Sequence, residues 1–325
     1  MNKIINKLSK EQTILNNRYI IKEQLGFGIT STVYKVEDMQ TEEIKAAKIF
    51  ENNMKEEFEK EVNIFNKISE INASSNIKYY ESGIDSYTKK GRSVQKMYII
   101  LEYGNHGSLY DVLFEKKSGF SEVVIKLIFF IILNAIEVIH RHGICHRDIK
   151  PENMLFVGDN YDIKLCDFGC SKRFLNKNNK KILLHKRIGT PYYCAPEILE
   201  AKKYQGDKID IFSIGALLFI LMTGKFAFKE AKENNNLYKY IKTKKYDSFW
   251  DLLENQLSIK TLSEKFKKLF VKLVAYNPEE RPSIEEIKSD EWMKDILNSN
   301  DEELNFLRYK MIDEINMVSL LGAFL

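Results

Sequence analysis

Cysteine is scarce in this chain of 325 residues, and its spacing excludes two classes of protein. The four cysteines lie at positions 145, 166, 170 and 194. They lack the paired spacing of a zinc site and the framework of a disulfide-rich secreted domain. We therefore expect reduced thiols and an intracellular protein. Cys166, which lies just before an acidic residue, is interpreted as a buried packing residue.

A strong excess of one charge is also missing. The 50 Lys and Arg residues and 46 Asp and Glu residues give a formal net charge of +4. Nucleic-acid-binding domains usually carry a larger and more clustered basic excess. We therefore expect no nucleic-acid partner.

Long uninterrupted hydrophobic runs are absent as well. Residues 123–139 are rich in Ile, Leu and Phe but contain Lys126, Asn134 and Glu137, which favours a helix buried in a globular core over a membrane span. The first ten residues show no apolar core of signal-peptide length, and position 2 is not the glycine that myristoylation requires. The expected location is the cytoplasm, with nuclear access left open.

The hydrophobic content of 44% is sufficient for a sizeable core. Residues 18–101 show mostly the alternation of strands, interrupted by one helical pattern. The expected strands are Tyr19–Gln24, Val33–Glu37, Glu43–Phe50, Ile77–Ile84 and Val94–Leu101, the helix is Lys55–Ile68, and residues 86–93 form an exposed hairpin loop. Helical patterns follow at Ser108–Phe114, Val123–His142, Lys208–Met222, Asn235–Lys242 and Glu264–Ala275. A small β-rich part joined to a larger helical part predicts a cleft for a small ligand.

A glycine-rich segment joins the first two expected strands. It comprises Leu25, Gly26, Phe27, Gly28, Ile29, Thr30, Ser31, Thr32 and Val33. Glycines let backbone N–H groups approach a phosphate closely, although the same pattern also suits a plain hairpin turn. No helix opens after the segment, so it is not a dinucleotide-binding fingerprint.

An alanine pair precedes a lysine on the next strand. Lys48 follows Ala46 and Ala47, and Glu61 lies on the helix expected after it. An ion pair between Lys48 and Glu61 would hold the ammonium group toward the phosphates of a nucleotide. Taken singly, each residue is more often a solvated surface charge.

The most specific segment is His-Arg-Asp-Ile-Lys-Pro-Glu-Asn at residues 146–153, followed by an Asp-Phe-Gly turn that begins at Asp167. Phosphoryl transfer needs a carboxylate that orients the attacking hydroxyl and accepts its proton, together with oxygen ligands for Mg²⁺. We assign the first role to Asp148 and the second to Asn153 and Asp167. Lys150 would neutralise the transferred phosphoryl group.

These segments resemble the motifs of the eukaryotic protein kinase family, in family order, from about Tyr19 to Trp292. Further matching positions are Ala195-Pro196-Glu197, Asp210 with Gly215, and Arg281. The resemblance implies an α+β bilobal fold with a small β-rich N-lobe and a larger, mainly helical C-lobe. It also implies a division into an extension at 1–18, a kinase domain at 19–293 (N-lobe 19–101, hinge 102–104, C-lobe 105–293) and a helical tail at 294–325.

The resemblance assigns roles to single residues as well. ATP would be the phosphoryl donor with Mg²⁺, or alternatively Mn²⁺. The residues enclosing adenine would be Leu25, Val33, Ala46 and Leu155, and the backbone that bonds its edge would be that of Glu102 and Gly104. Glu197 would pair with Arg281, Asp210 would hold the catalytic loop, and a hydrophobic stack would contain Phe65, Tyr79, His146 and Phe168.

Several features are similar to the serine/threonine type within the family, closest in texture to the calcium/calmodulin-dependent branch. They include Lys150 and Gly189-Thr190-Pro191. The implied activity is transfer of the ATP γ-phosphate to Ser or Thr hydroxyls of a protein substrate. The alternative is a nucleotide-binding pseudokinase scaffold, which commonly lacks one of the residues that are present here: Lys48, Asp148, Asn153 and Asp167.

The segment between Cys170 and Thr190 departs from the family pattern. It carries seven basic residues and no acidic residue, and Lys186 occupies the usual phosphoacceptor position four residues before Thr190. Our hypothesis is that activity does not depend on phosphorylation in the middle of this loop. An acidic substrate or partner would neutralise the loop, or the loop is a solvated segment without a role. Ser31 also replaces the usual third glycine, which predicts weaker phosphate cover.

Residues 298–325 contain five acidic and two basic residues, a net charge of −3, with Leu304, Leu307, Met311 and Ile315 at helical spacing. Calmodulin-binding helices are typically basic, so we do not expect that role. Two interpretations stay open. The first is a docking helix, which binds a partner, a second copy or the chain itself, and the second is a helical cap on the larger lobe.

Overall fold

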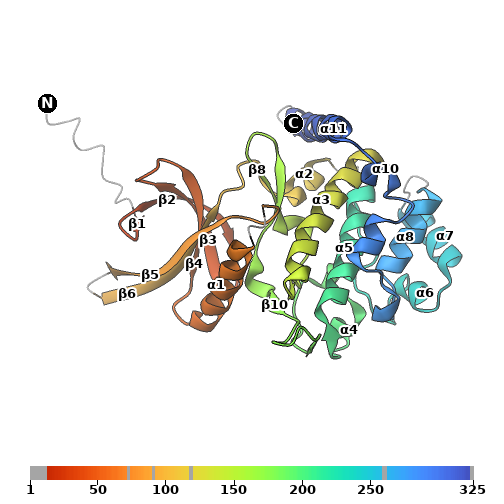
Figure 1. Ribbon diagram of the computed structural model, residues 1–325, viewed down its shortest axis with the longest axis horizontal. Helices are drawn as coiled ribbons and strands as arrows, with labels where there is room; N and C mark the ends of the chain where they lie inside the picture. The colour runs from red at the N-terminus through yellow and green to blue at the C-terminus, as the bar shows by residue number, and fades with distance from the viewer. Residues whose placement is uncertain (1–12, 72–73, 90–91, 117–119, 258–261, 323–325) are drawn as a thin grey trace. The chain divides into compact units, whose positions relative to one another are not determined.

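The structure is a computed structural model that describes residues 13–71, 74–89, 92–116, 120–257 and 262–322. The chain divides between Tyr103 and Gly104 into two compact units, which we call unit 1 and unit 2 and describe separately. Unit 1 is mostly sheet and unit 2 is mostly helix (Figure 1). The predicted α+β fold class is confirmed.

The described residues of unit 1 form one antiparallel six-stranded sheet and one helix. The sheet order is β1-β2-β3-β4-β6-β5. The strands are β1 (Ile14–Leu15), β2 (Tyr19–Phe27), β3 (Ser31–Asp38), β4 (Ile44–Phe50), β5 (Tyr79–Lys89) and β6 (Arg92–Glu102), and the helix is α1 (Lys55–Glu70). The strand β1 precedes the expected start of the domain at residue 19, and its Leu15 belongs to the buried core of this sheet.

The central strand β4 explains why the sheet is well packed. Six consecutive residues after Ile44 are buried. Four of them are apolar, and the two lysines, Lys45 and Lys48, are paired with Asp38 and Glu61. On α1, the residues Phe58, Glu61, Phe65 and Ile68 are buried at spacings of three and four, which places one stripe of the helix on the protein interior. Glu61 is the one acidic member of that stripe.

The predicted exposed loop at residues 86–93 is largely strand instead. Ser86 pairs with Gln95, Thr88 with Ser93 and Lys89 with Arg92, which leaves residues 90 and 91 between β5 and β6. The β-compatible residues Tyr87, Thr88 and Val94 continue the ladder, and composition alone does not reveal this pairing.

Unit 2 is built mainly from helices. They are α2 (Leu109–Lys116), α3 (Glu122–Arg141), α4 (Pro196–Leu199), α5 (Gly206–Thr223), α6 (Tyr238–Lys242), α7 (Tyr246–Leu257), α8 (Glu264–Leu273), α9 (Ile284–Lys288), α10 (Lys294–Leu297) and α11 (Asp301–Gly322). The short strands form three antiparallel pairs, β8 (Met154–Val157) with β9 (Asp162–Leu165), β7 (Ile144–Cys145) with β10 (Lys172–Arg173), and β11 (Leu183–Leu184) with β12 (Tyr204–Gln205).

Two long apolar helices form much of the interior of unit 2. In the described part of the chain, α3 is the one helix long and apolar enough to cross a membrane. A buried core helix passes the same test, and ten residues of α3 are buried within the protein. The buried-helix prediction for residues 123–139 agrees with this packing. The helix α5 is buried over most of its length and includes the fully buried Asp210.

Two elements of unit 2 differ from the sequence-based expectation. The helix expected from Asn235 begins at Tyr238, because the Asn235 side chain accepts hydrogen bonds from the backbone N–H groups of Leu237 and Tyr238, both at 3.0 Å. Such a side-chain bond favours a turn ahead of a helix. The helix α7 was not predicted, although its buried Phe249, Trp250 and Leu253 lie at helical spacing.

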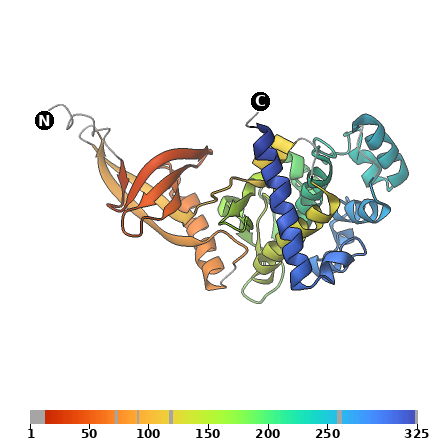
Figure 2. The same cartoon turned by 90° about the horizontal axis from the view of Figure 1, so that it is seen from above.

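The final helix α11 lies along unit 2 against α2 and α3 (Figure 2). Leu307, Met311 and Ile315 are buried, so the apolar stripe seen in the sequence faces the protein. Arg308 pairs with Asp162 at 2.8 Å, and Glu314 accepts a hydrogen bond from the backbone N–H of Ser121 at 3.0 Å. These polar contacts flank the apolar stripe.

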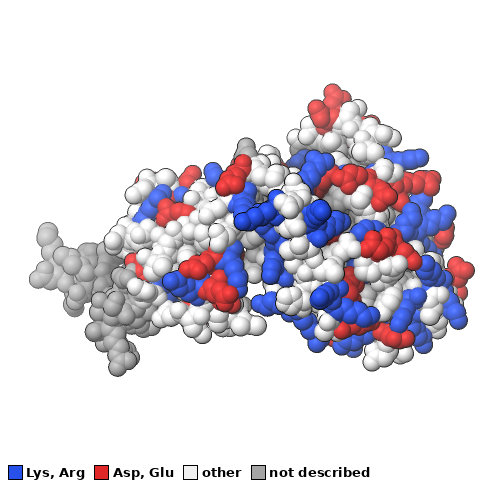
Figure 3. All heavy atoms as spheres, turned by 60° about the horizontal axis from the view of Figure 1, so that its bottom comes forward, with Lys and Arg blue, Asp and Glu red and all other residues white. Residues whose placement is uncertain are grey.

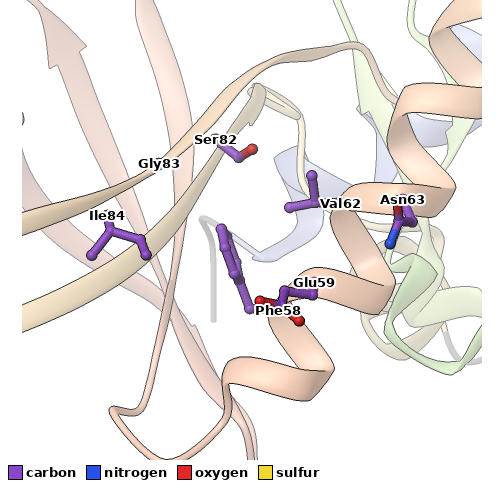
Figure 4. A pocket seen from close by; sticks show the side chains of 7 residues that line it. All are labelled: Phe58, Glu59, Val62, Asn63, Ser82, Gly83 and Ile84. Carbon is purple, nitrogen blue, oxygen red and sulfur yellow. The ribbon is translucent and has the colours of Figure 1, made fainter.

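Unit 1 also has a surface pocket between α1 and β5, with a volume of about 360 Å³ (Figure 4). Its lining residues are Phe58, Glu59, Val62, Asn63, Ser82, Gly83 and Ile84. None of these residues belongs to the motifs that carry the predicted chemistry.

Candidate active site

The predicted site residues fall into two groups, one within each unit. In unit 1, the glycine-rich segment is the turn that joins β2 to β3. The N–H of Gly28 donates to the carbonyl of Ser31 at 2.9 Å, and Gly26 pairs with Val33. The side chains of Phe27 and Ile29 at this turn are 79% and 93% exposed. The turn therefore combines glycine backbone at positions 26 and 28 with two large exposed apolar side chains.

The Lys48–Glu61 pair is present as predicted from the sequence. The Lys48 ammonium nitrogen lies 2.7 and 2.8 Å from the two carboxylate oxygens of Glu61. Both side chains are buried. A buried pair with both oxygens engaged is strongly oriented, so Glu61 on α1 fixes the direction of the lysine on β4.

The adenine residues proposed from the family resemblance are divided between the units. In unit 1, Ala46 on β4 pairs with Lys35 on β3 and Leu101 on β6, and Glu102 ends β6. In unit 2, a Cβ atom added to Gly104 would lie 3.0 Å from Cβ of Leu155. A larger residue at 104 would therefore crowd Leu155, which explains the glycine at this position.

The backbone of the catalytic segment is anchored by Asp210 of α5. The carboxylate oxygens of Asp210 accept hydrogen bonds from the backbone N–H groups of His146 and Arg147, each at 2.8 Å. His140 Nε2 lies 2.8 Å from the same carboxylate. Arg147 has a φ of 69°, a left-handed conformation that costs energy for a non-glycine residue. The buried Asp210 stabilises this bend.

Asp148, Lys150 and Asn153 come together within unit 2. Lys150 Nζ lies 2.8 Å from Asp148 Oδ2, and Asn153 Nδ2 donates to Asp148 Oδ2 at 3.3 Å and to the Asp148 carbonyl at 2.8 Å. Oδ1 of Asp148 accepts hydrogen bonds from the backbone N–H and the hydroxyl of Thr190, at 3.0 and 2.8 Å. One carboxylate oxygen is therefore held by the lysine and the amide, and the other meets a hydroxyl group.

Lys150 carries a firmly held positive charge. Its burial alone would lower its pKa, but the hydrogen bond with Asp148 and the charges of Asp148, Glu152 and Asp167 outweigh that effect and raise the pKa above its usual value. The ammonium is therefore charged at neutral pH. It also donates to the hydroxyl oxygen of Thr190 at 3.0 Å, so lysine and aspartate face the same hydroxyl.

The pairing of β8 with β9 brings Asn153 and Asp167 to the same end of a hairpin. The N–H of Cys166 donates to the carbonyl of Asn153 at 2.9 Å, directly before Asp167. Because the Asn153 amide nitrogen is engaged by Asp148, its oxygen is the atom left for a ligand. Asp167 has a left-handed backbone with φ of 58° and accepts from the N–H of Gly169 at 3.4 Å.

An amide oxygen and a carboxylate suit a hard divalent cation, which is commonly bound by one or two carboxylates together with phosphate oxygens. The described residues contain no cluster of three or more His, Cys, Asp or Glu side chains that could hold a metal on their own. The pair therefore fits a metal that arrives with a nucleotide.

The members of the expected hydrophobic stack meet in pairs within each unit. In unit 1, the rings of Phe65 and Tyr79 stack with centroids 5.4 Å apart. In unit 2, His146 and Phe168 meet edge to face at 5.2 Å, and His146 Nε2 lies 2.9 Å from the carbonyl of Cys166. The second contact ties the catalytic segment to the Asp-Phe-Gly turn.

Glu197 and Arg281 form the expected buried pair in unit 2. The two guanidinium nitrogens lie 2.6 and 2.8 Å from the two carboxylate oxygens. Arg281 also donates to the carbonyls of Ala275 and Lys208 at 2.9 and 3.0 Å. This network joins α4 to α5 and to the segment before α9.

Sequence reasoning missed three residues that complete this arrangement. Thr190 was noted as part of a motif but not as the partner of Asp148, and nothing singled out His140 or Tyr204. Thr190, His140 and Tyr204 are separated in sequence from the residues they contact by 42, 70 and 57 positions. Local periodicity gives no signal for contacts between residues so far apart in the sequence. The available clue for Thr190 was its place in the Gly189-Thr190-Pro191 motif.

Comparison with known proteins identifies the family. A model of the protein kinase domain matches residues 19–293, and the chain belongs to this family. It is 30% identical over 293 residues to CBL-interacting protein kinase 26 of Oryza sativa subsp. japonica, covering 88% of this chain and 54% of that protein. It is 29% identical over 299 residues to CBL-interacting serine/threonine-protein kinase 16 of Arabidopsis thaliana, covering 88% and 59%.

The similarity confirms the sequence-based recognition of a protein kinase of the serine/threonine type. The chain is also 31% identical over 299 residues to CBL-interacting protein kinase 10 of Oryza sativa subsp. japonica. The aligned region covers 90% of this chain and 60% of that protein. The chain thus spans between half and about three-fifths of the length of these relatives.

Proposed function

We propose that the protein is an active serine/threonine protein kinase, which transfers the γ-phosphate of ATP to Ser or Thr hydroxyls of a protein. The observation that carries the proposal is the hydroxyl of Thr190 held between Asp148 Oδ1 and Lys150 Nζ, at 2.8 and 3.0 Å. An acceptor hydroxyl at such a position would face a base and a positive charge at once. That is the combination phosphoryl transfer needs.

Asp148 orients the acceptor hydroxyl and accepts its proton as the hydroxyl oxygen forms a bond to the γ-phosphorus. The bond between that phosphorus and the bridging oxygen breaks, and the electron pair leaves with ADP. Lys150 stabilises the negative charge on the transferred group. Lys48, oriented by Glu61, binds phosphate oxygens of the nucleotide.

Asn153 and Asp167 are the residues we assign to a divalent cation, with Mg²⁺ first and Mn²⁺ as the alternative. When bound, the cation neutralises charge on the phosphates. The nucleotide contacts are assigned to the glycine-rich turn, to Leu25, Val33 and Ala46 in unit 1, to Leu155 in unit 2, and to the backbone of Glu102 and Gly104.

We propose that α11 acts as an intramolecular cap on unit 2. Its buried Leu307, Met311 and Ile315 and its ion pair from Arg308 to Asp162 support this role. The relatives are named for interaction with CBL. We assign no such partner to this chain. Removal of residues 298–325 would lower the thermal stability of unit 2 if the cap is correct, whereas a helix reserved for a partner would leave it unchanged.

The test of the kinase proposal is phosphate transfer from radiolabelled ATP to a degenerate peptide array, with wild type beside Asp148→Asn. We expect label on Ser and Thr peptides for the wild type and a rate lower by about 10²–10⁴-fold for the variant. Nucleotide binding, measured by thermal shift with ATP and Mg²⁺, should be similar in both.

A pseudokinase scaffold would give a different pattern. ATP would still shift the melting temperature, but the wild type would transfer no more label than Asp148→Asn with either Mg²⁺ or Mn²⁺. That outcome would refute the kinase proposal.

A further inference from the structure

An exposed basic surface lies beside the catalytic residues of unit 2. We name it the basic segment and define it by its seven exposed cations, which are Lys172, Arg173, Lys177, Lys180, Lys181, Lys186 and Arg187. No acidic residue interrupts it. The concentration of one charge contrasts with the near balance of the whole chain.

Most of these charges have no counterion among the described residues. Lys181 pairs with Asp207 at 2.6 Å. The other six form no ion pair with any residue in the described part of the chain. Like charges that stay close together without counterions repel each other and raise the free energy of the folded state, so a ligand of opposite charge would be stabilising.

The backbone holds the basic segment in one arrangement. The N–H of Phe174 donates to the carbonyl of Gly143 and the N–H of Ile182 to the carbonyl of Phe174, both at 2.8 Å. Lys172 and Arg173 pair with β7, and Leu183 and Leu184 pair with β12. Backbone hydrogen bonds therefore hold the chain that carries the cations in place. This order reduces the conformational entropy lost when a ligand binds.

The end of the basic segment lies close to Asp148. Arg187 precedes Thr190 by three residues, which limits their Cα separation to about 11 Å, and the Thr190 hydroxyl bonds to Asp148. The pKa of Cys194 is affected by charges on both Asp148 and the end of the basic segment. Burial and the charge of Asp148 raise its pKa to about 12, while Arg187 and Lys150 act in the opposite direction. The charges of Arg187 and Asp148 thus both reach one thiol.

Figure 3 shows the side of the molecule on which several Lys and Arg side chains of unit 2 lie close together. Glu152 is an exposed acid in the neighbourhood of the catalytic residues, and its charge acts on Lys150 and Tyr193. The surroundings of an acceptor therefore carry the basic segment and also the exposed acid Glu152.

We propose that the basic segment binds Asp and Glu side chains of the protein substrate, within about four residues of the acceptor hydroxyl. The inference rests on the proposed kinase function and adds the substrate class. An extended peptide spans about 3.3–3.6 Å per residue, so four residues cover the distance from Asp148 to Arg187 and its neighbours. Lys186 and Arg187 are the members nearest to Thr190 along the chain.

The test compares peptides that share one acceptor serine and differ in two flanking positions, filled with Asp, Ala or Lys. One series places these residues before the serine and another places them after it. For wild type we expect kcat/KM for the Asp peptide of one series to exceed that for the Ala peptide by about tenfold, since two exposed ion pairs, each of modest strength, act together. The Lys peptide should fall below the Ala peptide. At 0.5 M salt the ratio should approach one.

The variant Lys186→Glu with Arg187→Glu should reverse the preference, so that the Lys peptide becomes better than the Asp peptide. A matched control is Lys268→Glu with Lys294→Glu, two exposed lysines on α8 and α10 without an ion pair in the described part of the chain. The control should keep the wild-type ratio. Because each protein is judged by the ratio of its own rates, a partly misfolded variant still gives a readable result.

The outcomes separate this inference from the kinase proposal. If no peptide is phosphorylated above Asp148→Asn, the kinase proposal fails. If all peptides are phosphorylated with equal kcat/KM, or the control loses the preference as much as the Lys186 and Arg187 variant, the inference fails while the kinase proposal stands. A wild-type preference for the Lys peptide over the Asp peptide in both series would also overturn it.

Discussion

Arg147 donates a hydrogen bond from Nη1 to the hydroxyl of Tyr204 at 3.1 Å, and this hydroxyl donates to the carbonyl of Lys186 at 2.7 Å. Nε of Arg147 donates to the carbonyl of Cys170 at 2.7 Å. By the family resemblance, Arg147 is the residue that would hold an activating phosphate. In this protein neutral groups of the chain already engage it, and they connect it to the residue in the usual phosphoacceptor position.

This relationship predicts the effect of Tyr204→Phe. The change leaves Arg147 and the Lys186 carbonyl without one hydrogen-bond partner, which costs about 1–3 kcal/mol when the groups are buried. We expect faster amide hydrogen exchange over residues 183–188 and a kcat several-fold lower. Tyr309→Phe on α11, at a residue that is 70% exposed, is the matched control and should change neither quantity.

The same relationship supports activity without phosphorylation of the loop. Wild-type protein treated with phosphatase should keep its kcat, and intact-mass measurement should show no phosphate on active protein. Loss of activity after phosphatase, together with a phosphosite mapped within residues 170–188, would contradict the interpretation.

The Lys48–Glu61 pair predicts a stability effect as well as a functional one. Glu61→Gln removes the carboxylate charge that lies 2.7 Å from the buried Lys48 ammonium. Removal of one partner of a buried pair destabilises by roughly 3 kcal/mol. The double variant Lys48→Met with Glu61→Leu should recover most of the free energy of unfolding while remaining inactive. Glu59→Gln on the exposed side of α1 should have an effect of only a few tenths of a kcal/mol. Denaturant unfolding measures all three, and equal stability of Glu61→Gln and wild type would count against the pair.

Asp38 predicts a specific pH dependence of stability. Hydrogen bonds from Arg18 lower its pKa most, burial acts in the opposite direction, and Lys45 and the N–H of Gln40 add to the lowering, so the pKa lies well below its usual value. A carboxylate with a lower pKa in the folded state stabilises the fold above the unfolded pKa of about 4. That stabilisation is lost as pH falls from there through the folded-state pKa.

The measurement is the free energy of unfolding from pH 6 down to pH 3, for wild type and Asp38→Asn. The wild-type curve should fall more steeply below about pH 4, because only in wild type does the unfolded chain take up a proton at position 38 that the folded protein does not bind. Asp251→Asn, at an exposed position of α7, controls for loss of a negative charge. Parallel curves for wild type and Asp38→Asn would show that the Arg18–Asp38–Lys45 cluster does not set the acid sensitivity.

The backbone conformation of Gly189 places Thr190 beside Asp148, which predicts that a larger residue at 189 lowers activity. Its φ is +99°, and a Cβ atom there would lie 2.7 Å from the Arg147 carbonyl oxygen. Gly189→Ala should displace Thr190 from Asp148 and lower kcat/KM by about tenfold or more. Gly158→Ala is the matched control, since its φ is +68° but a Cβ atom would meet nothing within 4 Å. Only the first variant combines strain with a collision, so equal kinetics for the two would argue against the role of Gly189.

Much of the local structure could be predicted from the sequence because it depends on short-range patterns. The alternation in β2 to β4 and the spacing of Phe58, Phe65 and Ile68 on α1 gave the correct elements, and their ends shifted by a few residues. The helix α7 was missed, and the β5–β6 hairpin was predicted with strands that are too short. Polar strand residues such as Ser86 and Thr88 pair through their backbone, and composition does not report that pairing.

The residue types needed for phosphoryl transfer were determined by the sequence itself. Lys48, Glu61, Asp148, Asn153 and Asp167 are chemical groups in a fixed order, and their order identified the family. Their geometry was decided only by the tertiary structure. Thr190 reaches Asp148 across 42 positions, and Tyr204 reaches Arg147 across 57. Hydrogen bonds at such separations depend on how helices and hairpins pack, because the unfolded chain places these groups at no particular distance from each other.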